Sequence, residues 1–201
     1  RKWLDKKFNK KLIYLRIKSR KIFSSVYETV LKSNSLYKFC HVNKLDDIAS
    51  KFLKVPKSSL STRPSFRIDV PQDTRNTYDW HQDSVYDNFN ISSDNGVTLW
   101  IPLINTTKKN GTVLVKPGSQ NEKGKIRYSK HKGSKYKSEQ IVIHKKFLKK
   151  YKSKSVNVKA YNALAFHHGV FHKSGYNSSK QVRFVVLARY NKMISKDFIH
   201  F

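Results

Sequence analysis

The chain has 201 residues and a formal net charge of +29, and 38% of its residues are hydrophobic and 13% aromatic. This length suits one domain, since such a chain can bury roughly 70% of its unfolded surface, and the aromatic content argues against general disorder. Cys40 is the single cysteine, which excludes an intrachain disulfide and a four-cysteine zinc site and favours a reducing, cytoplasmic setting. The apolar runs fall far short of the ~20 residues that span a bilayer, so no membrane span is expected.

The positive charge has three explanations. The basic residues are 33 lysines and 9 arginines. Phosphate and base recognition favours arginine, whose planar fork binds in two places at once, so nucleic-acid binding is the least favoured explanation. An AT-rich genome, which also enriches Lys, Asn, Ile, Tyr and Phe, is the most favoured. Electrostatic steering of an anionic substrate or cosubstrate stands between them.

Helices are predicted for the first part of the chain. Over residues 12–31, apolar side chains recur largely at intervals of three and four, which is typical of amphipathic helices. A further helix is predicted over residues 44–53, because Asp46 and Asp47 lie near its N-terminus and Pro56 follows its end. For these basic helices, packing against a sheet is favoured over binding to a membrane surface.

From residue 60 onward the pattern changes to short alternating or β-branched runs separated by Gly, Pro and Asn, as in a β-sandwich or barrel. Segment 121–138, polar and dense in Lys, is predicted to be a mobile surface loop. The expected fold is mostly β, a cupin-like jelly roll over residues 59–201 with helical support from residues 1–58, in one domain. Strands are predicted over residues 65–70, 78–83, 97–104, 112–116, 140–144, 155–159, 163–167, 170–173 and 181–190.

Two potential metal ligands lie in the predicted strand 78–83. Alternation on a strand would place His81 and Asp83 on one face, where an imidazole nitrogen and a carboxylate oxygen can meet one cation. Alone the pair carries little weight, because such spacing arises by chance. It needs a third ligand from elsewhere in the chain.

The third ligand is expected in segment 166–177, where His167, His168 and His172 compete. Spacing selects His172, which precedes Arg183 by eleven residues, so that Arg183 would lie on the next antiparallel strand. Two histidines and one carboxylate cover one face of an octahedron and leave three positions open, as in non-haem iron oxygenases. His167 and His168 are interpreted as supporting or hydrogen-bonded histidines.

Arg183 has a predicted role of its own. Alternation places its side chain on the same strand face as Val185 and Leu187, so a charge points where apolar groups point. A buried guanidinium is suited to the distal carboxylate of 2-oxoglutarate, which it can grip with two hydrogen bonds. Ser174, two residues after His172, can donate to the same carboxylate. The alternative is a solvent-facing arginine at a strand end.

Four blocks in this order resemble the phytanoyl-CoA dioxygenase family. They are Trp80-His81-Gln82-Asp83-Ser84-Val85-Tyr86, residues 96–103, residues 110–119 with their two turns at Asn110-Gly111 and Pro117-Gly118, and His172-Lys173-Ser174 with Arg183. Gln120 departs from the family, which commonly has His after Pro-Gly-Ser. The departure bears on substrate class more than on activity.

The resemblance implies a double-stranded β-helix that uses Fe(II), 2-oxoglutarate and O₂ and hydroxylates a C–H bond of a small, anionic or neutral, organic substrate, releasing succinate and CO₂. It implies iron at His81, Asp83 and His172, and cosubstrate at Arg183, Ser174 and Trp100. Tyr86, Lys116 and Phe171 are candidate substrate contacts, with ordinary packing as the alternative for each. The competing hypothesis is a basic jelly-roll module that binds nucleic acid or another polyanion without turnover.

Overall fold

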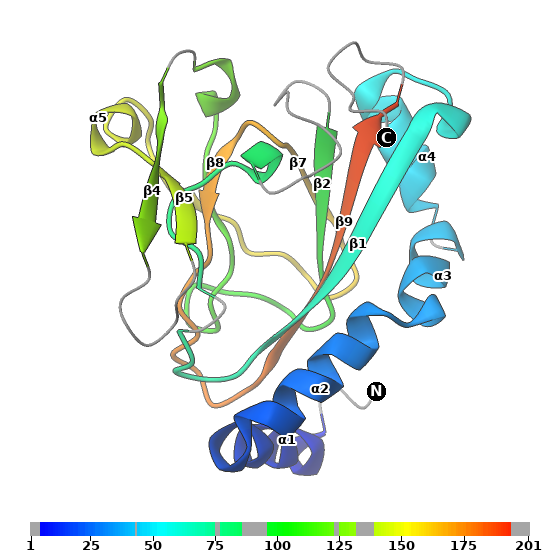
Figure 1. Ribbon diagram of the computed structural model, residues 1–201, viewed down its shortest axis with the longest axis vertical. Helices are drawn as coiled ribbons and strands as arrows, with labels where there is room; N and C mark the ends of the chain where they lie inside the picture. Colours follow the sequence, from blue (N-terminus) through cyan, green and yellow to red (C-terminus); the bar gives the residue numbers. More distant parts are fainter. Residues whose placement is uncertain are drawn as a thin grey trace.

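A computed structural model of the chain describes residues 5–42, 44–74, 77–85, 96–122, 125–131 and 139–193. The four helices before residue 54 lie along one side of it, and the strands and one short later helix make up the rest (Figure 1). Tyr86, which was predicted to contact substrate, lies outside the described residues. Among the described helices, none is both long and apolar enough to cross a membrane.

The helical part comprises α1 (Lys6–Lys18), α2 (Arg20–Leu31), α3 (Asn34–Val42) and α4 (Leu45–Leu53). Asp5 caps α1 by accepting a hydrogen bond from the Lys7 amide at 2.7 Å. Ser19 separates the first two helices: its extended backbone ends α1, and its hydroxyl accepts from the Ile22 amide to start α2. The helix predicted over residues 44–53 is found as α4, and the two turns around Ser19 and Ser33 divide the preceding helical segment.

The larger sheet has four antiparallel strands in the order β1-β9-β2-β7. Its long pair is β1 (Leu60–Asp69) and β9 (Arg183–Lys192), which align over ten residues from Leu60 opposite Lys192 to Asp69 opposite Arg183. Strand β2 (Gly96–Pro102) follows on the other side of β9, and β7 (Leu164–His167) is the far edge.

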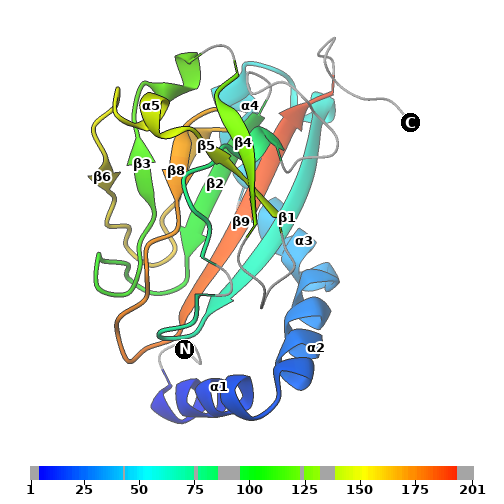
Figure 2. The same ribbon diagram turned by 60° about the vertical axis from the view of Figure 1, so that its left-hand side comes forward.

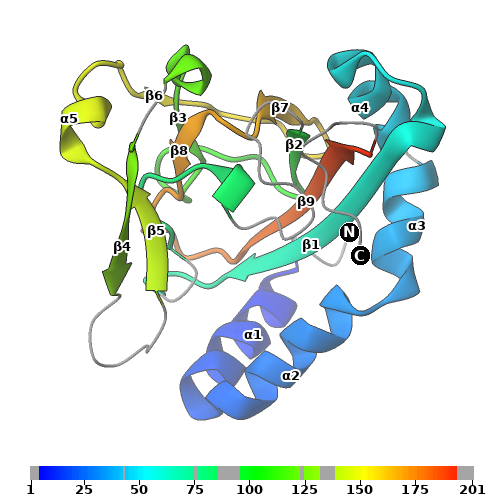
Figure 3. The ribbon, with the colours of Figure 1, turned by 45° about the horizontal axis from the view of Figure 1, so that its top comes forward.

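A second sheet faces the inner side of the first. It has the order β6-β3-β8, with β6 at Lys154–Ser155, β3 at Leu114–Lys116 and β8 at Phe171–Lys173. A separate pair, β4 (Arg127–His131) and β5 (Glu139–Ile143), continues to the short helix α5 (Lys145–Leu148). These elements lie on the side away from α1–α3 (Figure 2, Figure 3).

The two faces of the larger sheet have separate cores. On β9, Phe184, Val186 and Ala188 point to the helices and join one cluster with helix residues such as Phe23. The alternate side chains Val185 and Leu187 point inward and form a second cluster between the sheets, with Trp100, Val113, Val115, Val158, Phe166 and Val170. Alternation along one strand therefore anchors the helices outside and shapes an interior space inside.

Three sequence predictions differ from the structure. Of the strand predicted over residues 155–159, only Ser155 lies in a strand, β6. Residues 78–83 do not form a strand: His81 makes a single antiparallel bridge with His172, and Asp83 begins the 3₁₀ turn η3 (Asp83–Val85). Strand alternation therefore does not set the directions of the His81 and Asp83 side chains. The bridge to His172 and the 3₁₀ turn set them. Segment 121–138 contains β4, which was predicted as loop. Pairing with β5 uses only main-chain groups, so the segment forms a strand without the hydrophobic alternation that sequence reasoning requires.

Candidate metal and cosubstrate site

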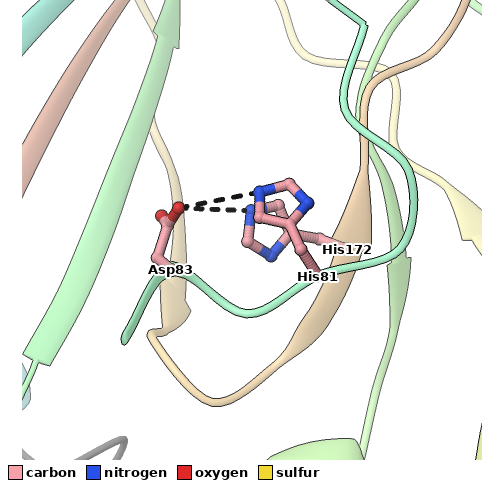
Figure 4. A group of neighbouring side chains, drawn as sticks. All are labelled: His81, Asp83 and His172. Atoms are coloured by element: carbon pink, nitrogen blue, oxygen red, sulfur yellow. Dashed lines mark ion pairs between the residues drawn. The ribbon is translucent and has the colours of Figure 1, made fainter. Parts of the chain in front are cut away.

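Three buried side chains from two parts of the chain converge beside β8. The Nε2 atoms of His81 and His172 lie 3.9 Å and 3.6 Å from Oδ1 of Asp83, and the ligand atoms of all three lie within 4.8 Å of one another. Figure 4 shows both imidazoles side by side with the carboxylate facing them. With metal–ligand bonds of about 2.1 Å, two atoms on one ion lie at most about 4.2 Å apart, so each His–Asp pair fits a shared cation.

The main chain fixes the tautomer of both histidines. Nδ1 of His81 lies 2.7 Å from the carbonyl oxygen of Asp79, and Nδ1 of His172 lies 2.9 Å from that of Val170. A carbonyl only accepts, so each Nδ1 carries the proton and each Nε2 presents a lone pair toward Asp83. Burial, together with the neighbouring His172, lowers the pKa of His81 to about 3, so this imidazole is neutral at neutral pH.

Asp83 is held by two further groups. The Thr98 hydroxyl, on β2, donates to its Oδ2 at 2.5 Å, and the Arg189 guanidinium, on β9, lies 3.1 Å from Oδ2 and donates to Oδ1 at 3.2 Å. Burial raises the pKa of this carboxyl, but the Arg189 guanidinium and His172 outweigh burial and hold the pKa well below its usual value. Asp83 therefore stays charged and fixed in direction, as a ligand for a divalent cation must be.

A cavity of about 380 Å³ opens beside the three ligand side chains. It is bordered by all three predicted metal ligands and by the three predicted cosubstrate residues, Arg183, Ser174 and Trp100. Apolar walls come from Val113, Phe166 and Leu187. One space thus reaches both the metal position and the guanidinium intended for the cosubstrate.

Arg183 is 3% exposed and is anchored from behind by a carboxylate. Its Nη2 and Nε donate to Oδ2 of Asp69 at 2.7 Å and 3.2 Å. Its Nη1 has no hydrogen-bond partner among the described residues, although it is buried. A buried donor without a partner is costly, and a carboxylate from a ligand would satisfy it.

Gly111 lets the backbone approach Arg183 closely. It has a φ of +83°, and a Cβ at this position would lie 2.7 Å from the carbonyl oxygen of Gly175 and 2.9 Å from Nη1 of Arg183. Ser174 lies at the same end, where its Oγ accepts from Nη1 of Arg67 at 3.2 Å and keeps its own hydrogen to donate. A cation with a donor that has no partner among the described residues, beside the Ser174 hydroxyl, fits the distal carboxylate of 2-oxoglutarate.

The predicted substrate residues Lys116 and Phe171 lie elsewhere in the described structure. Neither borders the cavity. Nζ of Lys116 donates to the carbonyl of Tyr151 at 2.5 Å and lies 4.9 Å from the centre of the Trp80 ring. Phe171 is completely buried in a third cluster with Ile126 and Ile143. The strand alternation of β8 explains this, because His172 faces the cavity and Phe171 therefore faces away.

Sequence reasoning missed Asp69, Arg67 and Arg189, which fix the directions of the predicted groups. A signal for them was present. On β1 the cavity face carries Arg67 and Asp69 at alternate positions, and on β9 Arg189 continues the series of inward positions that begins at Arg183. Charges at alternate positions of a strand whose other face is mostly apolar indicate a polar interior.

The sheet arrangement and the site define the class of non-haem, 2-oxoglutarate-dependent oxygenases. The sequence profile of the family "Phytanoyl-CoA dioxygenase (PhyH)" matches residues 15–185, and the chain belongs to this family. Enzymes of the family use Fe(II), 2-oxoglutarate and O₂. No curated protein sequence matches the chain.

Solved structures share the fold at low sequence identity. EvdO2 from Micromonospora carbonacea var. aurantiaca, solved also in complex with 2-oxoglutarate, superposes with a TM-score of 0.61 at 17% identity, over 84% of this chain and 64% of that one. The 2-oxoglutarate-dependent epimerase SnoN and carbocyclase SnoK of nogalamycin biosynthesis each give 0.59, at 16% and 19% identity. They are covered over 59% and 55% of their length, by 82% and 74% of this chain. The chain thus spans about three fifths of the length of these structures.

Proposed function

We propose that the chain binds Fe(II) through His81, Asp83 and His172 and binds 2-oxoglutarate with its distal carboxylate on Arg183. In this proposal it hydroxylates a C–H bond of a small organic substrate, with release of succinate and CO₂. The observation that carries it is that one cavity is bordered by a buried His-Asp-His group and by Arg183, whose buried Nη1 has no hydrogen-bond partner among the described residues. The larger and smaller sheets would be the two halves of a double-stranded β-helix.

When bound, iron, cosubstrate and O₂ would supply the oxidant. The side chains would hold the metal and the cosubstrate, orient them and exclude water. Both Nε2 atoms offer lone pairs because their Nδ1 protons are committed to main-chain carbonyls. Thr98 and Arg189 keep Asp83 charged and aimed. Ser174 and Nη1 of Arg183 would receive the distal carboxylate.

Water exclusion falls to the apolar wall. Trp100, Phe166 and Leu187 are 4%, 7% and 7% exposed and border the cavity beside the ligands. A dry surface strengthens the ion pairs inside the cavity and protects a reactive species from solvent. Hydroxylation is proposed over halogenation because a carboxylate, Asp83, stands at the position that a halide would need.

The test is an anaerobic titration with Fe(II) and 2-oxoglutarate, followed by the weak visible charge-transfer band of the chelate. Wild-type protein is expected to develop the band, and Arg183→Met to need at least about tenfold more cosubstrate, because a charged hydrogen bond is lost. Arg127→Met, which removes an arginine on β4 outside the cavity lining, is the control. Wild-type protein without Fe(II) binding would support the competing hypothesis of a polyanion-binding module.

A further inference from the structure

Helix α1 lies beneath the end of the larger sheet where β1 finishes and β9 begins (Figure 2). That end carries Asp69 and Arg183, the last aligned pair of the two strands. The family profile starts at residue 15, so most of α1 precedes the matched region, and the match assigns it no role. The contacts of α1 nevertheless converge on the backbone that carries Arg183.

Asn9 is a polar residue on the buried side of α1, and it is 6% exposed. Its Oδ1 accepts a hydrogen bond from the main-chain amide of Val182 at 2.8 Å, and its Nδ2 donates to the carbonyl of Asp5 at 2.9 Å. A donor faces Oδ1 and an acceptor faces Nδ2, so these two partners fix the orientation of the side-chain amide. The side chain therefore joins the first turn of α1 to the start of β9.

The acceptor half of the Asn9 side chain is the half that matters to β9. The ladder of β1 with β9 ends at Arg183, so the amide of Val182 lies beyond it, and Val182 is completely buried. A buried N–H that loses its acceptor is costly. The carbonyl of Asp5, in contrast, also accepts from the main-chain amide of Asn9 at 3.0 Å, so it keeps a partner without Nδ2.

Both chain neighbours of Arg183 are held by α1. Asn9 bonds to the main chain of Val182. The Phe8 ring stacks on the Phe184 ring, with 6.1 Å between the ring centres and 20° between the planes. Because side chains alternate along the chain, Val182 and Phe184 join the cluster under the helices while Arg183 borders the cavity. Helix α1 therefore fixes the stretch of backbone from which the guanidinium projects.

We propose that Asn9 is a positioning residue for the cosubstrate, which sets the place of the Arg183 guanidinium through the main chain of Val182. The inference rests on the proposed function and adds to its cosubstrate site a residue that precedes the matched family region. Asn9 does not border the cavity, so it acts only through β9. Charge-assisted hydrogen bonds depend on geometry, and a displaced guanidinium would bind the distal carboxylate less well.

The experiment uses protein loaded with Mn(II) and measures the dissociation constants of two keto acids by calorimetry. 2-Oxoglutarate has the distal carboxylate, whereas 2-oxopentanoate has a methyl group in its place and the same keto-acid end. Asn9→Leu keeps the approximate size of the side chain and removes the acceptor. It is expected to weaken 2-oxoglutarate binding about threefold to tenfold. The affinities for 2-oxopentanoate and for Mn(II) should stay at the wild-type values.

Asn9→Asp keeps an oxygen that can accept from the Val182 amide, so it should restore most of the affinity, which a general loss of packing would not allow. Arg16→Met is the matched control, because it breaks the 2.6 Å ion pair with Asp73 that also fastens α1 but leaves the bond to Val182 in place. Its affinity for 2-oxoglutarate should equal that of wild type. If circular dichroism shows that Asn9→Leu is unfolded, Asn9→Ala, which favours a helix, replaces it.

A double-mutant cycle tests the route through Arg183. In the Arg183→Met background, Asn9→Leu should have no further effect on 2-oxoglutarate affinity, because the group that it positions is gone. Three results would overturn the inference: equal losses for both keto acids, an undiminished effect in the Arg183→Met background, or wild-type 2-oxoglutarate affinity in Asn9→Leu.

Failure of the inference is distinguishable from failure of the proposed function. If wild-type protein binds neither Mn(II) nor 2-oxoglutarate, the proposed function fails and the role of Asn9 falls with it. If wild-type protein binds both and Asn9→Leu binds 2-oxoglutarate equally well, only the inference about Asn9 fails.

Discussion

The carboxylate of Asp69 accepts hydrogen bonds from both Nε and Nη2 of Arg183. The third nitrogen of that guanidinium, Nη1, is directed to Gly111 and the cavity. Asp69 also accepts from Arg67 at 3.1 Å, so one carboxylate orients two arginines. The proposed cosubstrate anchor is thus oriented from behind, by a residue outside the cavity lining.

Asp69→Asn is expected to weaken 2-oxoglutarate binding about tenfold and to destabilise the protein by about 3–5 kcal/mol, since it leaves two buried guanidinium groups without their counter-charge. Isothermal titration and urea unfolding measure the two effects. Asp73→Asn breaks the Arg16–Asp73 ion pair on the helical side and serves as control. It should reduce stability alone; equal cosubstrate affinity in both variants would contradict the role given to Asp69.

Stability below neutral pH should depend on the same carboxylate. Burial raises the pKa of Asp69, but Arg67 and Arg183 outweigh it and lower that pKa below its usual value. A carboxyl whose pKa is lower in the folded than in the unfolded state stabilises the fold fully when the pH is above the unfolded pKa of about 3.9. This stabilisation is lost as the pH falls through the folded-state pKa. The difference in unfolding free energy between wild type and Asp69→Asn should therefore be constant from pH 7 to about 5 and shrink below pH 4. A difference that grows on acidification would have the wrong sign.

Thr98→Val removes the hydroxyl that donates to Oδ2 of Asp83 while keeping the shape of the side chain. Metal affinity is expected to fall about 10- to 100-fold, as is typical when a group that orients a ligand is lost. Competition with a chelator for Mn(II) measures it. Thr106→Val is the control, because Thr106 is equally buried but bonds to the carbonyl of Val158 away from the ligands. Wild-type metal affinity in Thr98→Val would remove Thr98 from this role.

Two glycines separate backbone strain from the space beside Arg183. Gly111 and Gly118 have φ values of +83° and +87°. A Cβ on Gly111 would meet the carbonyl oxygen of Gly175 at 2.7 Å and Nη1 of Arg183 at 2.9 Å, whereas a Cβ on Gly118 would meet a Tyr151 ring carbon at 3.7 Å. Gly111→Ala should therefore be the less stable of the two variants. Both alanine variants should lose about 1 kcal/mol or more from the strained backbone. Only Gly111→Ala should also weaken 2-oxoglutarate binding. Equal affinities in the two variants would show that the space at Gly111 is not used.

The sequence predicts which distant side chains converge better than it predicts the local backbone structure that positions them. The convergence of His81, Asp83 and His172 is found, yet the reason given for it was wrong, because residues 78–83 form a bridge and a turn and no strand. Motif spacing reports which residues meet, whereas alternation reports faces only where a ladder exists. The family membership follows from the same spacing.

The alternating charges on β1 and β9 indicate a polar strand face, but the sequence does not show which of these charges meet. Asp69 and Arg67 precede Arg183 by more than a hundred residues, and only the ten-residue register of β1 with β9 brings them together. The predicted substrate contacts Lys116 and Phe171 do not border this cavity, and Phe171 packs in the third apolar cluster. Partner choice among strands depends on long-range packing, which a local pattern does not encode.

Strand β9 carries Arg183 and Arg189 six positions apart on one face. This stretch of backbone therefore sets the distance between the proposed cosubstrate anchor and the arginine that contacts Asp83, the proposed metal ligand. Because the separation is an even number of residues, both guanidinium groups lie on the cavity face of the strand. Adding or deleting one residue between them would turn one of the two arginines to the opposite face of β9, into the apolar cluster under the helices. A change of length in a loop would leave this separation intact, whereas a one-residue change within β9 would remove one of the two arginines from the site.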